Sequence, residues 1–118
     1  MKTITVTNNA RGWCVGHHIE IADSPYSRAK GLLGRTDLSA GNGLWIIPSN
    51  GVHTFGMQFS IDVIGVDRKL RIVRLWRDLK QNRLTLPSFK VKSVFELPSG
   101  SIDAMQASIG DLLTIHEH

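Results

Sequence analysis

Residues 53–63 alternate between apolar and polar side chains, and this pattern limits the possible folds more than any other feature of the chain. The apolar positions are Phe55, Met57, Phe59, Ile61 and Val63, and the polar positions are Thr54, Gly56, Gln58, Ser60 and Asp62. A period of two is typical of a β-strand with one face in a core. The sequence therefore predicts a strand that starts at His53, with a polar face formed by the even-numbered positions.

The remaining patterns predict many short strands. Alternation and turn residues indicate strands at 3–7, 13–21, 44–47, 61–66, 70–76, 91–97 and 112–115, with 61–66 and 70–76 as a hairpin. Asp23-Ser24-Pro25 is typical of a helix start and predicts a short helix near residues 25–33. Residues 77–90 are expected to form a long loop with a short strand at 84–86, and 101–107 a helical turn. We expect a mainly β, single compact β-sandwich or barrel-like domain.

Composition agrees with one domain over residues 1–118. The chain is 42% hydrophobic and 20% charged, and at this length it buries about two thirds of its unfolded surface. It has no apolar run near the roughly 20 residues of a membrane span. The amino end carries no apolar segment of a secretory signal, and the single Cys14 makes no internal disulfide. These features predict a cytoplasmic protein.

Several motifs occur together in the order found in one known family. They are Arg28-Ala-Lys-Gly-Leu-Leu-Gly-Arg35, Gly43-Leu-Trp45, His53-Thr-Phe-Gly-Met57, Ile61-Asp-Val63, Phe95-Glu-Leu-Pro-Ser-Gly100 and Ile109-Gly-Asp111. Over roughly residues 13–115 the chain resembles the domain of unknown function 192, in its His-Thr-Phe-Gly-Met branch. The resemblance implies a compact, mainly β domain that occurs both free and behind export signals, and whose biochemical role is not established.

His53 is the first candidate for a functional role. With Asp62 it suggests an acid-base dyad that activates Thr54, Ser60 or Ser49. However, an unbroken strand would separate His53 and Asp62 by about 30 Å and place them on opposite faces. We therefore expect a noncatalytic ligand-binding or accessory domain with a shallow polar pocket near His53. A hydrolase-like enzyme centred on His53 is the alternative, and no catalytic residue is assigned.

Two arginines and three carboxylates form a second group. Arg28 and Arg35 recur at helical spacing, and we expect them, with His53 and Thr54, to be the candidate ligand-binding residues. Asp62, Glu96 and Asp111 are expected to be structural, either in pairs with these arginines or as acceptors of backbone amides. An arginine left unpaired at the pocket rim would receive an anionic group.

Metal-binding patterns are weak. Cys14, His17 and His18 are close in sequence, but neighbouring histidines on a strand point to opposite faces, and there is no Cys-x-x-Cys. His116 and His118 have same-face spacing at the chain end. The sequence predicts no metal site and no cofactor.

Positive charge is concentrated in residues 68–92. This segment holds nine basic side chains and one acid, Asp78, within a chain of net charge +4. A basic interaction module is therefore a further alternative. Because no nucleic-acid-binding motif accompanies the charge, we expect no specific nucleic acid partner. The expected partner is an unknown small molecule or protein, and the sequence leaves the oligomeric state open.

Overall fold

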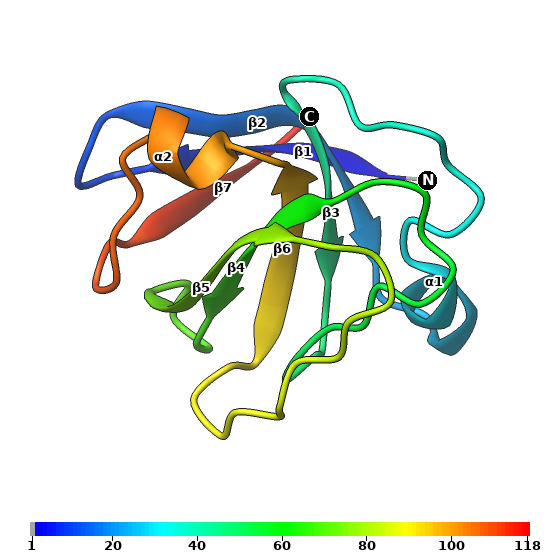
Figure 1. The fold of residues 1–118 in the computed structure, drawn as a ribbon. Helices are drawn as coiled ribbons and strands as arrows, with labels where there is room; N and C mark the ends of the chain where they lie inside the picture. The colour runs from blue at the N-terminus through cyan, green and yellow to red at the C-terminus, as the bar shows by residue number, and fades with distance from the viewer. Residues whose placement is uncertain (1) are drawn as a thin grey trace.

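A computed structural model describes residues 2–118 and shows one curled β-sheet (Figure 1). Its strands are β1 (Thr3–Asn8), β2 (Trp13–Ala22), β3 (Asn42–Ile46), β4 (Ile61–Val66), β5 (Ile72–Leu79), β6 (Ser93–Pro98) and β7 (Leu113–Glu117). They lie in the order β5-β4-β6-β3-β2-β1-β7. Only β2 and β3 pair in parallel among these neighbours, and the other pairs are antiparallel. The predicted mainly β, barrel-like class is confirmed.

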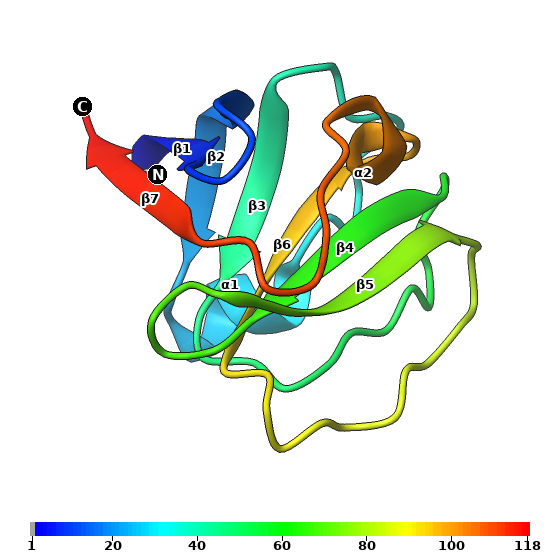
Figure 2. The same ribbon diagram turned by 90° about the vertical axis from the view of Figure 1, so that its left-hand side faces the viewer.

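The curl brings the two edge strands together at one end. Ile72 N donates to Asp111 O at 2.8 Å, Gly110 N donates to Ile72 O at 2.8 Å, and Leu113 N donates to Leu70 O at 2.9 Å. Figure 2 shows the segment before β7 passing beside the start of β5. These bonds pair backbone groups that an open edge would leave exposed. The sheet is therefore a partly closed barrel.

Apolar clusters cover both faces of the central strands. One includes Phe95 and Leu97 of β6, and the other includes Val94 of β6 with Ile61 and Val63 of β4. Because neighbouring strand residues point to opposite faces, β4 is buried along its whole length and β6 along nearly all of it. This explains why both strands have near-continuous apolar sequences.

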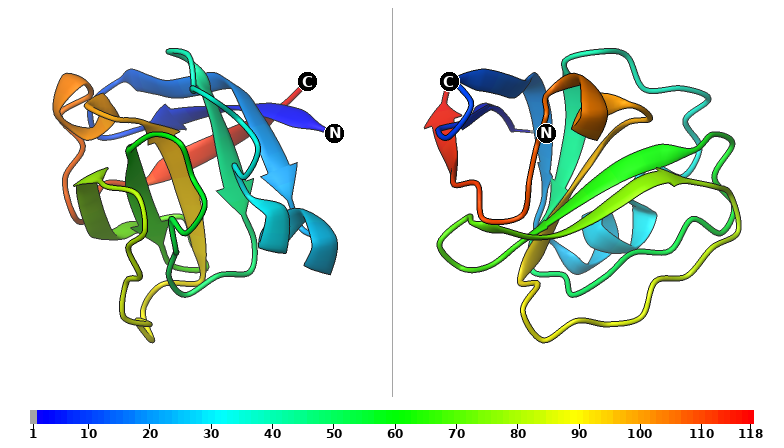
Figure 3. Two further views of the ribbon diagram at one scale, coloured as in Figure 1. Left: turned by 45° about the vertical axis from the view of Figure 1, so that its right-hand side comes forward. Right: turned by 60° about the vertical axis from the view of Figure 1, so that its left-hand side comes forward.

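Two short helices lie at opposite ends of the molecule (Figure 3). Helix α1 spans Pro25–Lys30, and Ser24 and Ser27 form a capping box at its start. It ends earlier than predicted because Gly31 has a φ of 50°, outside the helical region. Helix α2 spans Ser101–Ala104 and buries Ile102. No helix in residues 2–118 is long and apolar enough to cross a membrane.

The predicted strand through residues 53–63 is wrong over its first part. His53 forms only an isolated bridge, residues 55–56 form a turn, residues 58–59 form a bend, and the strand begins only at Ile61. Gly56 has a φ of 78°, which breaks the extended backbone. As a result Phe55 is 51% exposed and Phe59 only partly buried, whereas Met57 is buried. The apolar alternation identified a segment that packs on the core without forming a strand.

Three smaller predictions also need correction. Strand β5 begins at Ile72 rather than residue 70, because Leu70 adopts a positive φ of 68°. It continues to Leu79, so the following loop starts later than expected. The short strand at 84–86 is replaced by a single β-bridge between His53 and Leu84.

Candidate functional site

A cavity of about 400 Å³ lies between α1 and the loop that follows β3. Its wall combines side chains of α1 with Ile46 at the end of β3, residues 48–53 of the loop, Met57, and Glu96 of β6. The volume falls in the range of small-molecule sites, roughly 300–1,000 Å³. The cavity therefore joins a rigid sheet to a helix and a loop, an arrangement suited to binding.

Glu96 is the most unusual group in this wall. It lies in the middle of the sheet, opposite Leu44 of β3 and Val63 of β4, and is only 3% exposed. Its Oε1 atom has no hydrogen-bond partner within residues 2–118. A buried carboxyl without a partner is rare in folded proteins because its desolvation is not compensated.

Burial raises the pKa of the Glu96 carboxyl from 4.5 to about 7, and the positive charge of Arg35 offsets only part of this effect. Near neutral pH the group is therefore divided between a neutral form that donates a hydrogen bond and a charged form that accepts one. Titratable groups in this condition are common where a protein binds or transforms a ligand.

Arg28 of α1 lines the same cavity. Its Nη1 donates to Pro48 O at 3.3 Å, so the guanidinium connects the helix to the loop. Its Nε is buried and, across the described chain, also lacks a hydrogen-bond partner. Arg28 thus supplies a cationic group whose hydrogen-bonding capacity is only partly used within the described chain.

His53 lies at the exposed edge of the cavity. Its ring stacks on Phe55 with centroids 5.9 Å apart, and its backbone forms the bridge to Leu84. No hydrogen bond joins the His53 ring to another residue in the part of the chain that the structure describes. The ring is therefore held by packing and by the backbone, and neither ring nitrogen has a hydrogen-bond partner within residues 2–118.

The other two predicted ligand-binding residues lie outside the cavity. Thr54 is fully buried, and its Oγ1 donates to Lys80 O at 2.6 Å while accepting from Arg83 N at 2.8 Å. Arg35 follows the end of α1 and forms an ion pair with Glu20 in a separate hollow. The expectation that Arg28 and Arg35 share one side of a helix is wrong because the helix stops before Arg35.

Asp62 does not meet His53 in the cavity. Its Oδ1 accepts from Asp78 N at 2.8 Å, and its Oδ2 accepts from Ile102 N at 2.8 Å. The carboxylate thus joins β4 to the end of β5 and to α2, with both oxygens occupied by backbone amides. This geometry does not form the dyad that a His53-centred hydrolase would need.

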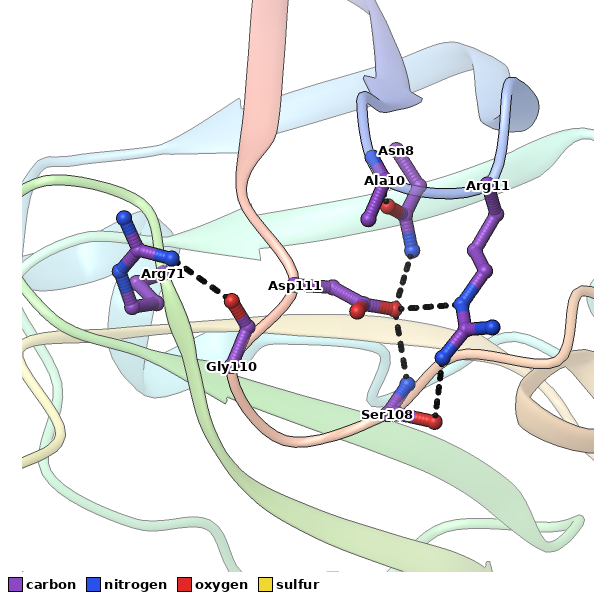
Figure 4. A network of polar contacts seen from close by, with 7 residues as sticks. All are labelled: Asn8, Ala10, Arg11, Arg71, Ser108, Gly110 and Asp111. Atoms are coloured by element: carbon purple, nitrogen blue, oxygen red, sulfur yellow. Dashed lines mark hydrogen bonds and ion pairs between the residues drawn. The ribbon is translucent and has the colours of Figure 1, made fainter.

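Asp111 organises the closure of the barrel (Figure 4). Its Oδ2 accepts from Asn8 Nδ2 at 2.9 Å, Ser108 N at 3.0 Å and Arg11 Nε at 3.3 Å. Burial alone would raise the pKa of Asp111, but the hydrogen bonds from these three residues outweigh it and hold the pKa below its usual value. Arg71 Nη1 donates to Gly110 O at 2.7 Å beside this network. The carboxylate pairs with Arg11 instead of the expected Arg28 or Arg35.

Metal-ligating residues do not gather in the described structure. Cys14 Sγ lies 3.7 Å from His17 Nδ1, but residues 2–118 contain no group of three or more His, Cys, Asp or Glu side chains that could hold a metal.

The basic segment 68–92 divides into two parts. On β5, Arg77 pairs with Asp103 at 2.9 Å, and Arg74 stacks over Trp76 at 5.1 Å. The loop after β5 carries cations together with large exposed apolar side chains: Leu84 is 69%, Leu86 83% and Phe89 98% exposed. This apolar group was not predicted, although Leu84-Thr-Leu86 within a basic loop was a visible signal for it.

The position of Glu96 in a cavity wall was also not predicted. The available signal was an isolated acid in the otherwise apolar stretch Val94-Phe95-Glu96-Leu97. An acid at a central strand position is a candidate buried carboxyl. Its lack of a partner, however, depends on how α1 and the loop of residues 48–53 pack against the sheet, which the sequence pattern does not specify.

Comparison with known proteins gives a family and a fold. Residues 5–115 match the family model of DUF192, described as an uncharacterized ACR. A UPF0127 protein from Thermococcus sibiricus is 32% identical over 109 residues, which cover 88% of this chain and 70% of that protein.

Two solved structures share the fold. A protein of unknown function from Novosphingobium aromaticivorans has a TM-score of 0.77 at 22% identity, covering 95% of this chain and 83% of the other. A proposed transcription regulator from Sinorhizobium meliloti has a TM-score of 0.80 at 19% identity, covering 97% of this chain and 92% of the other. At these identities the similarity concerns the fold alone.

Proposed function

The chain belongs to the uncharacterized DUF192 family, and we propose that it is a noncatalytic domain that binds a small polar ligand in the cavity beside α1. The observation that carries this proposal is the presence of two buried, unpartnered polar groups, Glu96 Oε1 and Arg28 Nε, in the wall of one cavity. Uncompensated burial of either group costs free energy, and a ligand that pairs with it removes that cost.

His53 completes the proposed site at its rim. Its backbone is fixed by the bridge to Leu84, whereas its ring nitrogens are available to a ligand. A mobile ligand binds best to groups that a rigid scaffold holds in place. The proposal uses Arg28 and His53 from the predicted residues, adds Glu96, and leaves out Thr54 and Arg35 because they lie outside the cavity. Cys14 is free and exposed, which supports a cytoplasmic location as part of the proposal.

The test is an NMR screen of the ¹⁵N-labelled protein against mixtures of small metabolites. A bound ligand should shift the amide signals of Gly31, Gly51 and Val52, which line the cavity. His53→Ala should keep the folded spectrum and weaken binding, whereas His17→Ala, outside the cavity, should not. Shifts confined to other parts of the sheet, or activity lost in a folded His53→Ala protein under a turnover assay, would contradict the proposal.

A second candidate function is an interaction surface on the loop of residues 80–92. The observation that favours it is the exposure of Leu84, Leu86 and Phe89 in a loop that contains four cations and no acid. Apolar side chains flanked by basic ones match an anionic lipid surface, where the apolar groups enter the interface and the cations pair with headgroups. Co-sedimentation of the protein with anionic vesicles tests this candidate.

A further inference from the structure

The charges in the cavity wall define what kind of ligand would satisfy both unpartnered groups. Glu96 offers a carboxyl whose Oε1 has no hydrogen-bond partner within residues 2–118, and Arg28 offers a guanidinium whose Nε has none, although its Nη1 donates to Pro48 O. A ligand that carries only one charge would leave either Glu96 Oε1 or Arg28 Nε, both buried atoms, without a partner. Because such an unpaired group reduces affinity strongly, a ligand with both charges is favoured.

The Glu96 carboxyl also lies beside the end of the helix that carries Arg28. A Cβ atom built on Gly31 would lie 3.8 Å from Glu96 Oε1 and 4.0 Å from Arg28 O. The carboxyl therefore lies against the turn of chain that carries Arg28. Both side chains line one cavity of about 400 Å³, so a small molecule that fills this cavity can reach both.

The rest of the wall mixes apolar and polar side chains. Its apolar side chains include Leu32, Leu33, Ile46, Val52 and Met57. These side chains are suited to an aliphatic group, because burying it removes apolar surface from water. The site thus combines an anionic position, a cationic position and a group of apolar side chains.

On the basis of the proposed function, we infer that the ligand is a small amino acid-like zwitterion with an aliphatic side chain. Its ammonium group donates to Glu96, its carboxylate accepts from Arg28, and its side chain contacts Leu33, Ile46 and Met57. Both protein atoms are covered in the structure. Binding therefore opens the seam between α1 and the loop, where the 3.3 Å hydrogen bond from Arg28 to Pro48 is long and weak.

The experiment compares L-leucine with two molecules that each lack one of its charged groups. Isopentylamine has the same branched chain without the carboxylate, and isocaproate has it without the amine. We expect isothermal titration calorimetry to show saturable binding of L-leucine, and binding at least about tenfold weaker for each of the other two. Binding should strengthen between pH 6 and pH 8, since the ammonium pairs with the ionised form of Glu96.

Two variants identify the contacts. Glu96→Gln preserves the shape of the side chain and should weaken L-leucine binding at least about tenfold and remove its dependence on pH. Arg28→Gln should weaken binding of L-leucine and isocaproate but leave isopentylamine unchanged. Glu117→Gln, on the exposed end of β7, is the matched control and should bind as the wild type does.

The outcomes separate this inference from the proposed function. If isocaproate or isopentylamine binds as tightly as L-leucine, and NMR places it in the same cavity, the inference of a zwitterionic ligand is wrong while the proposed ligand-binding function stands. If none of the three binds, the inference is also wrong, and the metabolite screen decides the proposed function independently. If L-leucine binds but shifts only signals outside the cavity, both are overturned.

Discussion

Glu96 Oε1 and Arg28 Nε come from a central strand and a peripheral helix, line one cavity, and are both buried without a hydrogen-bond partner in residues 2–118. Neither group gains stability from this position. A buried carboxyl in an apolar cluster destabilises the fold when it is ionised, and an apolar side chain of similar size would avoid that cost. The arrangement is therefore better explained by binding than by folding.

Glu96 should make the protein less stable as pH rises. Its pKa is raised from 4.5 to about 7 in the folded state, so the folded state holds the proton more tightly than the unfolded state. The resulting stabilisation of the folded state is fully present below about pH 4.5 and is lost as pH rises through about 7. Urea unfolding measures the free energy of unfolding at pH 5 and at pH 8. The difference between these two values should be about 2 to 3 kcal/mol smaller in Glu96→Gln than in the wild type.

Because each protein is compared with itself at two pH values, any effect of the new amide on the free energy of unfolding that does not depend on pH cancels. Glu117→Gln is the control, since its side chain is exposed at the end of the sheet, and it should leave the pH dependence unchanged. An identical pH dependence for Glu96→Gln and the wild type would mean that the Glu96 carboxyl is well solvated.

Asp62 should be important for stability. Its carboxylate accepts backbone amides from Asp78 and Ile102, both at 2.8 Å. Asp62→Ala leaves both amides without this acceptor and should lower the free energy of unfolding by roughly 1 to 3 kcal/mol. Asp67→Ala, which removes an acceptor of exposed turn amides, should lower the free energy of unfolding less. Thermal denaturation of both variants measures the difference. Equal effects of the two substitutions would contradict a specific structural role for Asp62.

Asp111 should control closure of the barrel. Asp111→Ala leaves the buried Asn8 amide unpaired and frees Arg11 and the Ser108 amide. We expect a loss of about 2 to 4 kcal/mol and faster hydrogen exchange at Ile72, Gly110 and Leu113, whose amides join the two edges. Because the pKa of Asp111 is lowered, its stabilisation is present above the unfolded pKa and is lost as pH falls through the folded pKa. Exchange that accelerates equally in the central strands would indicate global destabilisation instead.

The barrel interior should depend strongly on Phe95. Phe95 is fully buried and stacks on Trp45 with ring centroids 5.4 Å apart. Phe95→Ala should lower the free energy of unfolding by about 3 to 5 kcal/mol. Phe55→Ala is the matched control, since Phe55 is half exposed and should contribute much less. Similar melting temperatures for the two variants would show that the interior is loosely packed.

The sequence predicted the sheet well where local pattern decides structure. The hairpin of residues 61–66 and 70–76 and the helix start at Asp23-Ser24-Pro25 depend on neighbouring residues, and the structure contains both. Residues 53–60 were predicted wrongly because a strand and a packed turn can show the same alternation. The difference arises from Gly56 and from the bonds of Thr54 to the loop of residues 80–84, which are tertiary contacts.

The candidate site was only partly predictable for the same reason. His53 was selected at the start of the alternating segment and Arg28 for its helical spacing with Arg35, and both line the cavity. The environment of Glu96 depends on contacts from β3, β4 and the chain after α1, far apart in sequence. No local pattern specifies such a convergence, so the carboxyl was interpreted as a structural group.

The loop of residues 80–92 should associate weakly with anionic vesicles if it is an interaction surface. In co-sedimentation, the protein should bind vesicles of mixed phosphatidylserine and phosphatidylcholine but not vesicles of phosphatidylcholine alone. Binding should fall as the salt concentration rises, because the attraction to the anionic surface is electrostatic and is screened by salt. A double variant, Leu86→Ser with Phe89→Ser, should lose this binding while keeping its melting temperature, since both side chains are exposed. Tyr26→Ser, exposed on α1, is the control.

Nucleic acid is the competing anionic partner for the same basic segment. We expect only weak, sequence-indifferent binding that weakens steeply with salt, because cations such as Arg74 and Arg77 on β5 are already engaged by Trp76 and Asp103. Fluorescence anisotropy with two DNA duplexes of unrelated sequence measures this directly. Tight binding to one duplex at physiological salt, unaffected by the Leu86→Ser and Phe89→Ser variant, would reverse this ranking and identify the β5 cations as a nucleic-acid interface.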